Sequence, residues 1–189
     1  MNKNALKRLA VELRTEAGCG AHDRFDPYRL ADLYGVDVHR LSELECSEAA
    51  RVHFQVTRPD VFSGALVPLV TGGAVIIEND AHSSERRRST ASHEMAHLAL
   101  EHKFKASFVD DDIRRCRLTN KEQEAEAAEL SGELLLPFEA AKFLAIRGIP
   151  DEEAATRFDV SVDIAKWRLN STGARRMAER WARKQIRGP

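Results

Sequence analysis

Apolar positions recur at helical spacing over most of the chain. Leu6, Leu9 and Leu13 share one face of a helix, and a spacing of three to four residues returns after residue 84. The pattern therefore predicts helices on both sides of a central segment. The predicted helices cover residues 4–17, 27–34, 84–102, 120–136 and 139–147, followed by a helical stretch over 151–189.

Capping residues indicate where two of these helices begin. Asp26 comes directly before Pro27, which is the arrangement of an N-cap followed by proline at the first helical position. Thr119 and Glu122 form a capping-box pattern, in which each side chain bonds to the backbone N–H at the other position. Both patterns support the boundaries that the apolar spacing predicts.

The segment between residues 36 and 77 reads differently, because short apolar or alternating stretches are separated by turn residues. The predicted strands cover residues 36–38, 51–56, 62–67 and 74–77. Helices followed by strands and then helices indicate an α+β fold, with a small, mostly antiparallel sheet packed on the helix that follows it. We expect a first domain over residues 1–148 and a helical C-terminal region over residues 149–189.

Composition narrows the class of protein. Of the 189 residues, 43% are hydrophobic and 31% are charged, as in a soluble globular protein. No apolar run reaches membrane-spanning length and the N-terminus has no signal-peptide core, so we expect a cytoplasmic location without membrane association. The cysteines, Cys19, Cys46 and Cys116, form no Cys-x-x-Cys pair, which argues against a thiolate zinc site.

The strongest candidate chemistry lies at His93-Glu94-Met95-Ala96-His97. Two histidines four residues apart on a helix lie one turn from each other, so both imidazoles can reach one metal ion. A glutamate directly after the first histidine points into the same cleft, where it can take a proton from the attacking water. This set of residues is typical of zinc peptidases. The alternative is an amphipathic helix with two surface histidines.

A hydrolytic zinc site needs a third protein ligand, and the helix over 120–136 offers Glu124 and Glu126. Glu124 shares its face with small residues, so another helix can pack closely there, and a buried carboxylate needs a partner such as a metal. Glu126 lies on a face with other glutamates, which predicts a solvated stripe. We therefore favour Glu124, with Glu126 second. The small residues are Ala127, Ala128 and Ser131, and the glutamates are Glu122, Glu129 and Glu133.

His102 lies about 140° from His97 around an ideal helix. That angle places the two imidazoles on different faces, so they are not expected to share a metal. The sequence predicts a capping or surface role for His102.

Together these two segments resemble the ImmA/IrrE-type metallo-endopeptidase family. The resemblance rests on residues 88–98, which contain the His-Glu-x-x-His motif, and on residues 124–137, which begin at Glu124 and end in Leu-Leu-Leu-Pro. It implies a gluzincin-like zinc metallopeptidase with a zincin-like active site, in which His93, His97 and Glu124 bind Zn2+ and Glu94 is the catalytic base. It also implies a protein substrate, a helix-turn-helix transcriptional repressor whose cleavage releases stress-response or mobile-element genes. By analogy with other zinc peptidases, we expect an extended substrate segment to pair with strand 74–77.

Two other functions stay open. Residues 151–170 could form a helix-turn-helix, and residues 164–189 carry eight basic residues against the single acid Glu179, so the chain could be a DNA-binding regulator with a structural metal site. Direct contact of this basic region with nucleic acid is the less favoured interpretation, because such runs are usually solvated. A pseudo-peptidase that binds the repressor without cleaving it is the other alternative.

Overall fold

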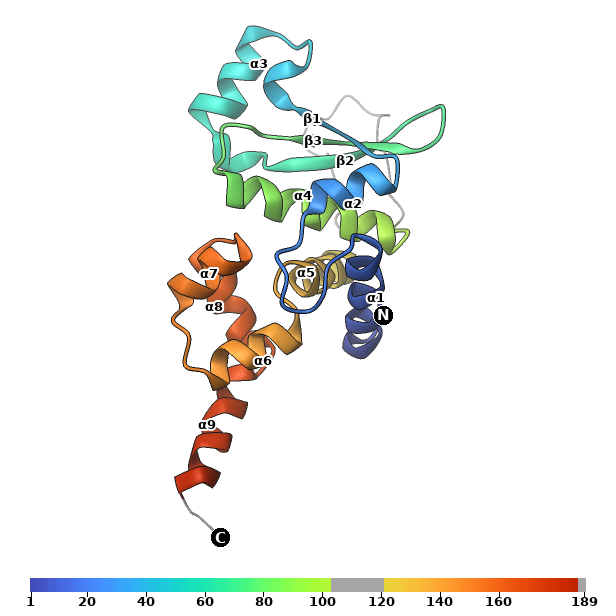
Figure 1. Cartoon of the computed structure of the whole chain (residues 1–189). Helices are drawn as coiled ribbons and strands as arrows, with labels where there is room; N and C mark the ends of the chain where they lie inside the picture. Colours follow the sequence, from blue (N-terminus) through green and yellow to red (C-terminus); the bar gives the residue numbers. More distant parts are fainter. Residues whose placement is uncertain (103–120, 187–189) are drawn as a thin grey trace.

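The computed structural model describes residues 1–102 and 121–186, and it has an α+β fold built in layers. A small sheet lies over α4, with α5 and α1 on the other side of that helix (Figure 1). The helices are α1 (Lys3–Glu16), α2 (Pro27–Leu33), α3 (Glu48–Val52), α4 (Ser84–Ala99), α5 (Lys121–Leu135), α6 (Phe138–Ile146), α7 (Asp151–Phe158), α8 (Val162–Ser171) and α9 (Ala174–Ile186), and the strands are β1 (Asp37–Arg40), β2 (Gly64–Pro68) and β3 (Ala74–Glu78).

The three strands follow the order β1-β3-β2, with β1 parallel and β2 antiparallel to β3. The sheet is therefore mixed, and the α+β class predicted from the sequence is confirmed. The expectation that strand 74–77 offers a free edge is wrong, because β3 is paired on both sides. Within the described part of the chain, β2 is the edge strand that packs against α4.

Close contact between β2 and α4 depends on Gly64. A β-carbon at this position would lie 2.5 Å from Cγ2 of Thr90 and 2.8 Å from the carbonyl oxygen of Ile77. A residue without a side chain therefore lets the strand approach the helix. Leu66 of β2 and Met95 of α4 are both buried.

The strand predicted over residues 51–56 is wrong. Residues Glu48–Val52 form α3, and one turn of π-helix follows over His53–Thr57. Ser47 caps this helix by accepting the Ala50 N–H at 3.2 Å. The alternation of Val52, Phe54 and Val56 imitates a strand, whereas the cap and the Glu-Ala-Ala sequence favour a helix.

The C-terminal helices continue from the end of α5, and the later part of α9 points away from the body of the molecule (Figure 1). Residues 179–185 are all exposed, including Trp181.

The proposed boundary at residue 148 stays a prediction. The described helices include none that is both long and apolar enough to cross a membrane. Thr119, the predicted helix cap, lies outside the described residues, whereas the Asp26 cap is confirmed by its bond to the Tyr28 N–H.

Candidate metal centre

The structure brings the three predicted metal ligands together from two packed helices. His93 and His97 lie one turn apart on α4, and Glu124 comes from the first turn of α5. The two Nε2 atoms are 3.1 Å apart. Oε2 of Glu124 is 3.2 Å from Nε2 of His93 and 3.6 Å from Nε2 of His97.

These distances fit one small metal ion. A tetrahedral zinc ion with bonds of about 2.05 Å separates its ligand atoms by about 3.3 Å. The three observed separations bracket that value. Among the described residues, His93, His97 and Glu124 form the one group of three or more such side chains close enough to share an ion.

The centre is closed on one side and open on the other. The His97 side chain is 3% exposed, whereas those of His93 and Glu124 are 27% and 32% exposed. One candidate ligand is thus fixed in the protein interior while the other two border solvent. A metal held there would keep an accessible position, as hydrolytic sites require.

Glu94 lies in the same region and is held by the sheet. Its Oε2 accepts the backbone N–H of Leu66, in β2, at 2.9 Å, and the residue is 2% exposed. This bond fixes a buried carboxylate against the edge strand. The sequence indicated Glu94 but not Leu66, because a backbone donor has no residue-type signal.

Of the capping and surface roles predicted for His102, the surface role is wrong. Its side chain is 7% exposed, and its Nδ1 lies 2.9 Å from Nδ1 of His97. Its Nε2 lies 3.3 Å from Oε2 of Glu126, which also contacts the terminal amine of Met1. Burial lowers the pKa of His102 and so favours the neutral ring. Glu126 therefore faces His102 instead of the three-ligand cluster.

The other end of α5 carries a different set of charges. Glu133, expected in a solvated stripe, is buried: it accepts the Phe138 N–H at 2.9 Å and pairs with Arg168 of α8 at 2.6 Å. Arg168 also donates to the Leu136 carbonyl at 3.0 Å and lies 3.4 Å from Glu129. The prediction failed here because the cation comes from a distant segment.

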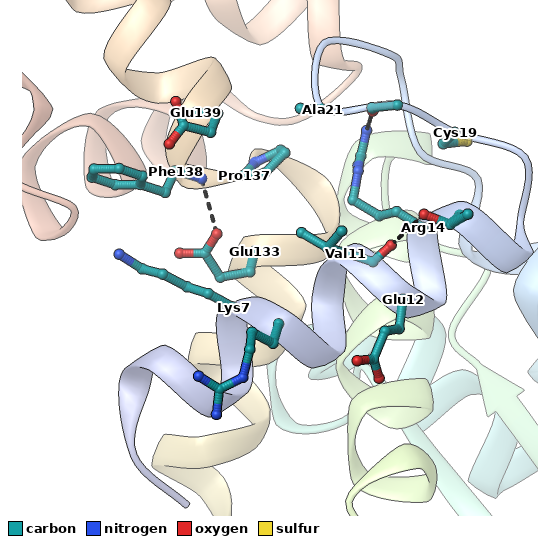
Figure 2. Close-up of a pocket in the computed structure, with 13 residues that line it drawn as sticks. Lys7, Val11, Glu12, Arg14, Cys19, Ala21, Glu133, Pro137, Phe138 and Glu139 are labelled. Atoms are coloured by element: carbon teal, nitrogen blue, oxygen red, sulfur yellow. Dashed lines mark hydrogen bonds between the residues drawn. The ribbon is translucent and has the colours of Figure 1, made fainter.

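A cavity of about 420 Å³ lies beside this buried end, between α1 and the start of α6. Figure 2 shows residues that line it, among them Glu133, Arg14, Phe138 and Lys7. Arg14 donates to backbone carbonyls, including that of Asp23 at 2.6 Å. Both cations and carboxylates line the cavity, so its lining favours neither charge.

Comparison with known families agrees with this geometry. The family model described as the IrrE N-terminal-like domain, a peptidase family, matches residues 46–170, which include α4, α5 and all three clustered ligands. A search of curated proteins finds no match. The matched segment covers most of the chain, and the cluster lies within it. The chain therefore belongs to the IrrE N-terminal-like family of metallopeptidases.

Proposed function

We propose that the chain is a cytoplasmic zinc-dependent endopeptidase in which His93, His97 and Glu124 hold the metal. The observation that carries the proposal is the convergence of these three donors at 3.1–3.6 Å beside a buried glutamate. A zinc ion bound there would supply a Lewis acid that acidifies water and polarises the peptide carbonyl.

Glu94 performs the proton transfers in this proposal. The Leu66 N–H orients the carboxylate, whose oxygens can accept a proton. Glu94 takes a proton from the attacking water and delivers it to the leaving amine. Since the same carboxylate serves both steps, loss of its charge should stop turnover without removing the metal ligands.

The outer edge of β2 is the proposed binding site for an extended substrate segment. The Leu66 N–H that reaches Glu94 is not used in pairing with β3, so this side of the strand faces the candidate catalytic group. A peptide pairing along β2 would pass beside the metal ligands. We propose a helix-turn-helix repressor as the protein substrate, on the basis of the family resemblance, with derepression of its genes as the result.

Cleavage by matched variants tests the proposal. Zinc-loaded wild type, Glu94→Gln and Glu85→Gln would each be incubated with candidate helix-turn-helix repressors, and fragments identified by mass spectrometry. Glu85 is a control on the same helix, at the end opposite the motif. We expect cleavage by wild type and Glu85→Gln only. Repressor binding without cleavage by any of the three proteins would favour a pseudo-peptidase.

A second candidate function is direct contact with nucleic acid through α9. This helix carries five basic residues and one acidic residue, and its later part is exposed on all sides. The helix-turn-helix regulator has less support, because α8 uses Arg168 and Trp167 to pack on α5. Salt-dependent DNA retardation that is lost in Arg180→Ala/Arg183→Ala, without repressor cleavage by wild type, would favour the DNA-binding function.

A further inference from the structure

A chain of hydrogen bonds lies behind His97, on the side away from the three-ligand cluster. It runs from Nδ1 of His97 to Nδ1 of His102 at 2.9 Å, and from Nε2 of His102 to Oε2 of Glu126 at 3.3 Å. His97 and His102 are the two most buried of these side chains. The role inferred below for these hydrogen bonds rests on the proposed function, because it concerns the same metal centre.

The chemistry of the three groups fixes where the protons are. An ionised carboxylate only accepts hydrogen bonds, so Nε2 of His102 must donate to Glu126. A neutral imidazole has one donor and one acceptor, so Nδ1 of His102 accepts. Nδ1 of His97 must then carry the proton, and its Nε2 keeps a lone pair.

That lone pair is directed at the three-ligand cluster. Nε2 of His97 lies 3.1 Å from Nε2 of His93 and 3.6 Å from Glu124. The chain of hydrogen bonds thus selects the tautomer that can ligate a metal. It also holds the ring in place and raises the basicity of the ligating nitrogen, as carboxylate-linked histidines do in metal sites.

The backbone at the end of α4 is shaped to bring His102 to this position. The helix ends at Ala99, and Glu101 adopts a left-handed conformation with φ of 52°. The His102 N–H then bonds to the His97 carbonyl at 3.1 Å, and the Glu101 N–H to Leu98 at 2.9 Å. This is a Schellman turn, which usually has glycine where Glu101 lies. A non-glycine residue in this conformation is strained.

We infer that His102 and Glu126 are positioning residues for the metal centre, which hold His97 in its ligating tautomer. Glu126 acts through His102 and is not itself a ligand. The two glutamates of α5 that the sequence left as rivals therefore have separate roles, Glu124 at the metal and Glu126 behind the histidine pair.

Zinc affinity of the metal-free protein, measured by competition with a chelator, tests the inference. We expect His102→Ala to weaken zinc binding by about 10- to 100-fold, the range typical of such outer partners. His102→Asn should recover part of the loss, because its side-chain oxygen can accept the His97 proton. Glu126→Ala should weaken binding less than Glu124→Ala, which removes a ligand. His39→Ala, at an exposed histidine, is the matched control.

A second readout separates positioning from a general loss of structure. Long-range proton–nitrogen NMR of the zinc-loaded wild type should show His97 protonated at Nδ1. His102→Ala should change the cobalt absorption spectrum of the site while the metal-free thermal midpoint stays close to that of His102→Asn. Zinc affinity equal to wild type in His102→Ala would overturn the inference and leave the proposed function intact. Failure of the wild type itself to bind zinc would overturn both.

Discussion

At the start of α5, Glu124 is 32% exposed and meets the imidazoles of two histidines, whereas towards the end of the same helix Glu133 is buried and paired with an arginine. Glu133 has a cation and a backbone N–H as partners, so its charge is compensated by the protein itself. Glu124 faces groups that are neutral when they act as metal ligands. Glu133, which is paired with the Arg168 cation, therefore supports the fold. Glu124, which faces two imidazoles, is available to bind a metal.

Arg168→Ala should have the largest effect on stability. It leaves Glu133 buried without its cation, and breaking such a pair typically costs about 3–5 kcal/mol of unfolding free energy. Urea denaturation of the metal-free protein measures this loss. If Arg168→Ala unfolds at the same urea concentration as wild type, the buried end of α5 does not have the structural role assigned to it.

Gly132→Ala should have an intermediate effect. A β-carbon there would lie 2.7 Å from the Trp167 ring and 2.9 Å from Cδ of Arg168, so α8 must move away from α5. Overpacking of this kind costs about 1–3 kcal/mol. The cost should shrink in a Trp167→Ala background, measured as a double-mutant cycle. Equal costs in the two backgrounds would show that the contact with Trp167 is not the cause.

Glu124→Ala should change the stability of the metal-free protein by less than about 1 kcal/mol, because the carboxylate is partly exposed and has no buried cation to leave unpaired. Its zinc affinity should nevertheless fall by more than that of any positioning variant. Thermal unfolding and chelator competition on the same sample measure both quantities. A large loss of stability without zinc would contradict the distinction between the two ends of the helix.

Lys142→Ala should have the smallest effect. Its partner Glu139 is 3.8 Å away, and the two side chains are 44% and 61% exposed. Surface pairs of this kind contribute about 0–1 kcal/mol, so the urea midpoint should barely move. A loss comparable with that of Arg168→Ala would mean that burial does not explain the difference between charge pairs in this chain.

The sequence predicted those features that depend on neighbouring residues. Helical spacing and the Asp26 cap located helices, and the four-residue spacing of His93 and His97 placed both rings at the cluster. The face of small residues on α5 also indicated Glu124. Each of these patterns involves residues that are close together in the sequence, so it does not depend on distant segments of the chain.

Features that depend on distant segments or on helix ends were not predictable. The partner of Glu133 is on α8, far from Glu133 in the sequence. The partner of Glu94 is the backbone N–H of Leu66, and every residue type except proline has such a group, so no residue type indicates it. His102 was assigned by continuing an ideal helix beyond Ala99, where the chain in fact turns back through a left-handed Glu101. Alternation over residues 51–56 misled for a different reason: it competes with another local pattern, the Ser47 cap, which outweighed it.

The three candidate ligands, His93, His97 and Glu124, belong to two helices that only the folded chain brings together. A metal that binds the native state and not the unfolded chain shifts the folding equilibrium, by about 2.7 kcal/mol when its free concentration is about 100 times the dissociation constant. In the proposed zinc peptidase, zinc supply would then set not only how many molecules are active but how long each one survives proteolysis. The lifetime of this protein would thereby report the availability of the metal.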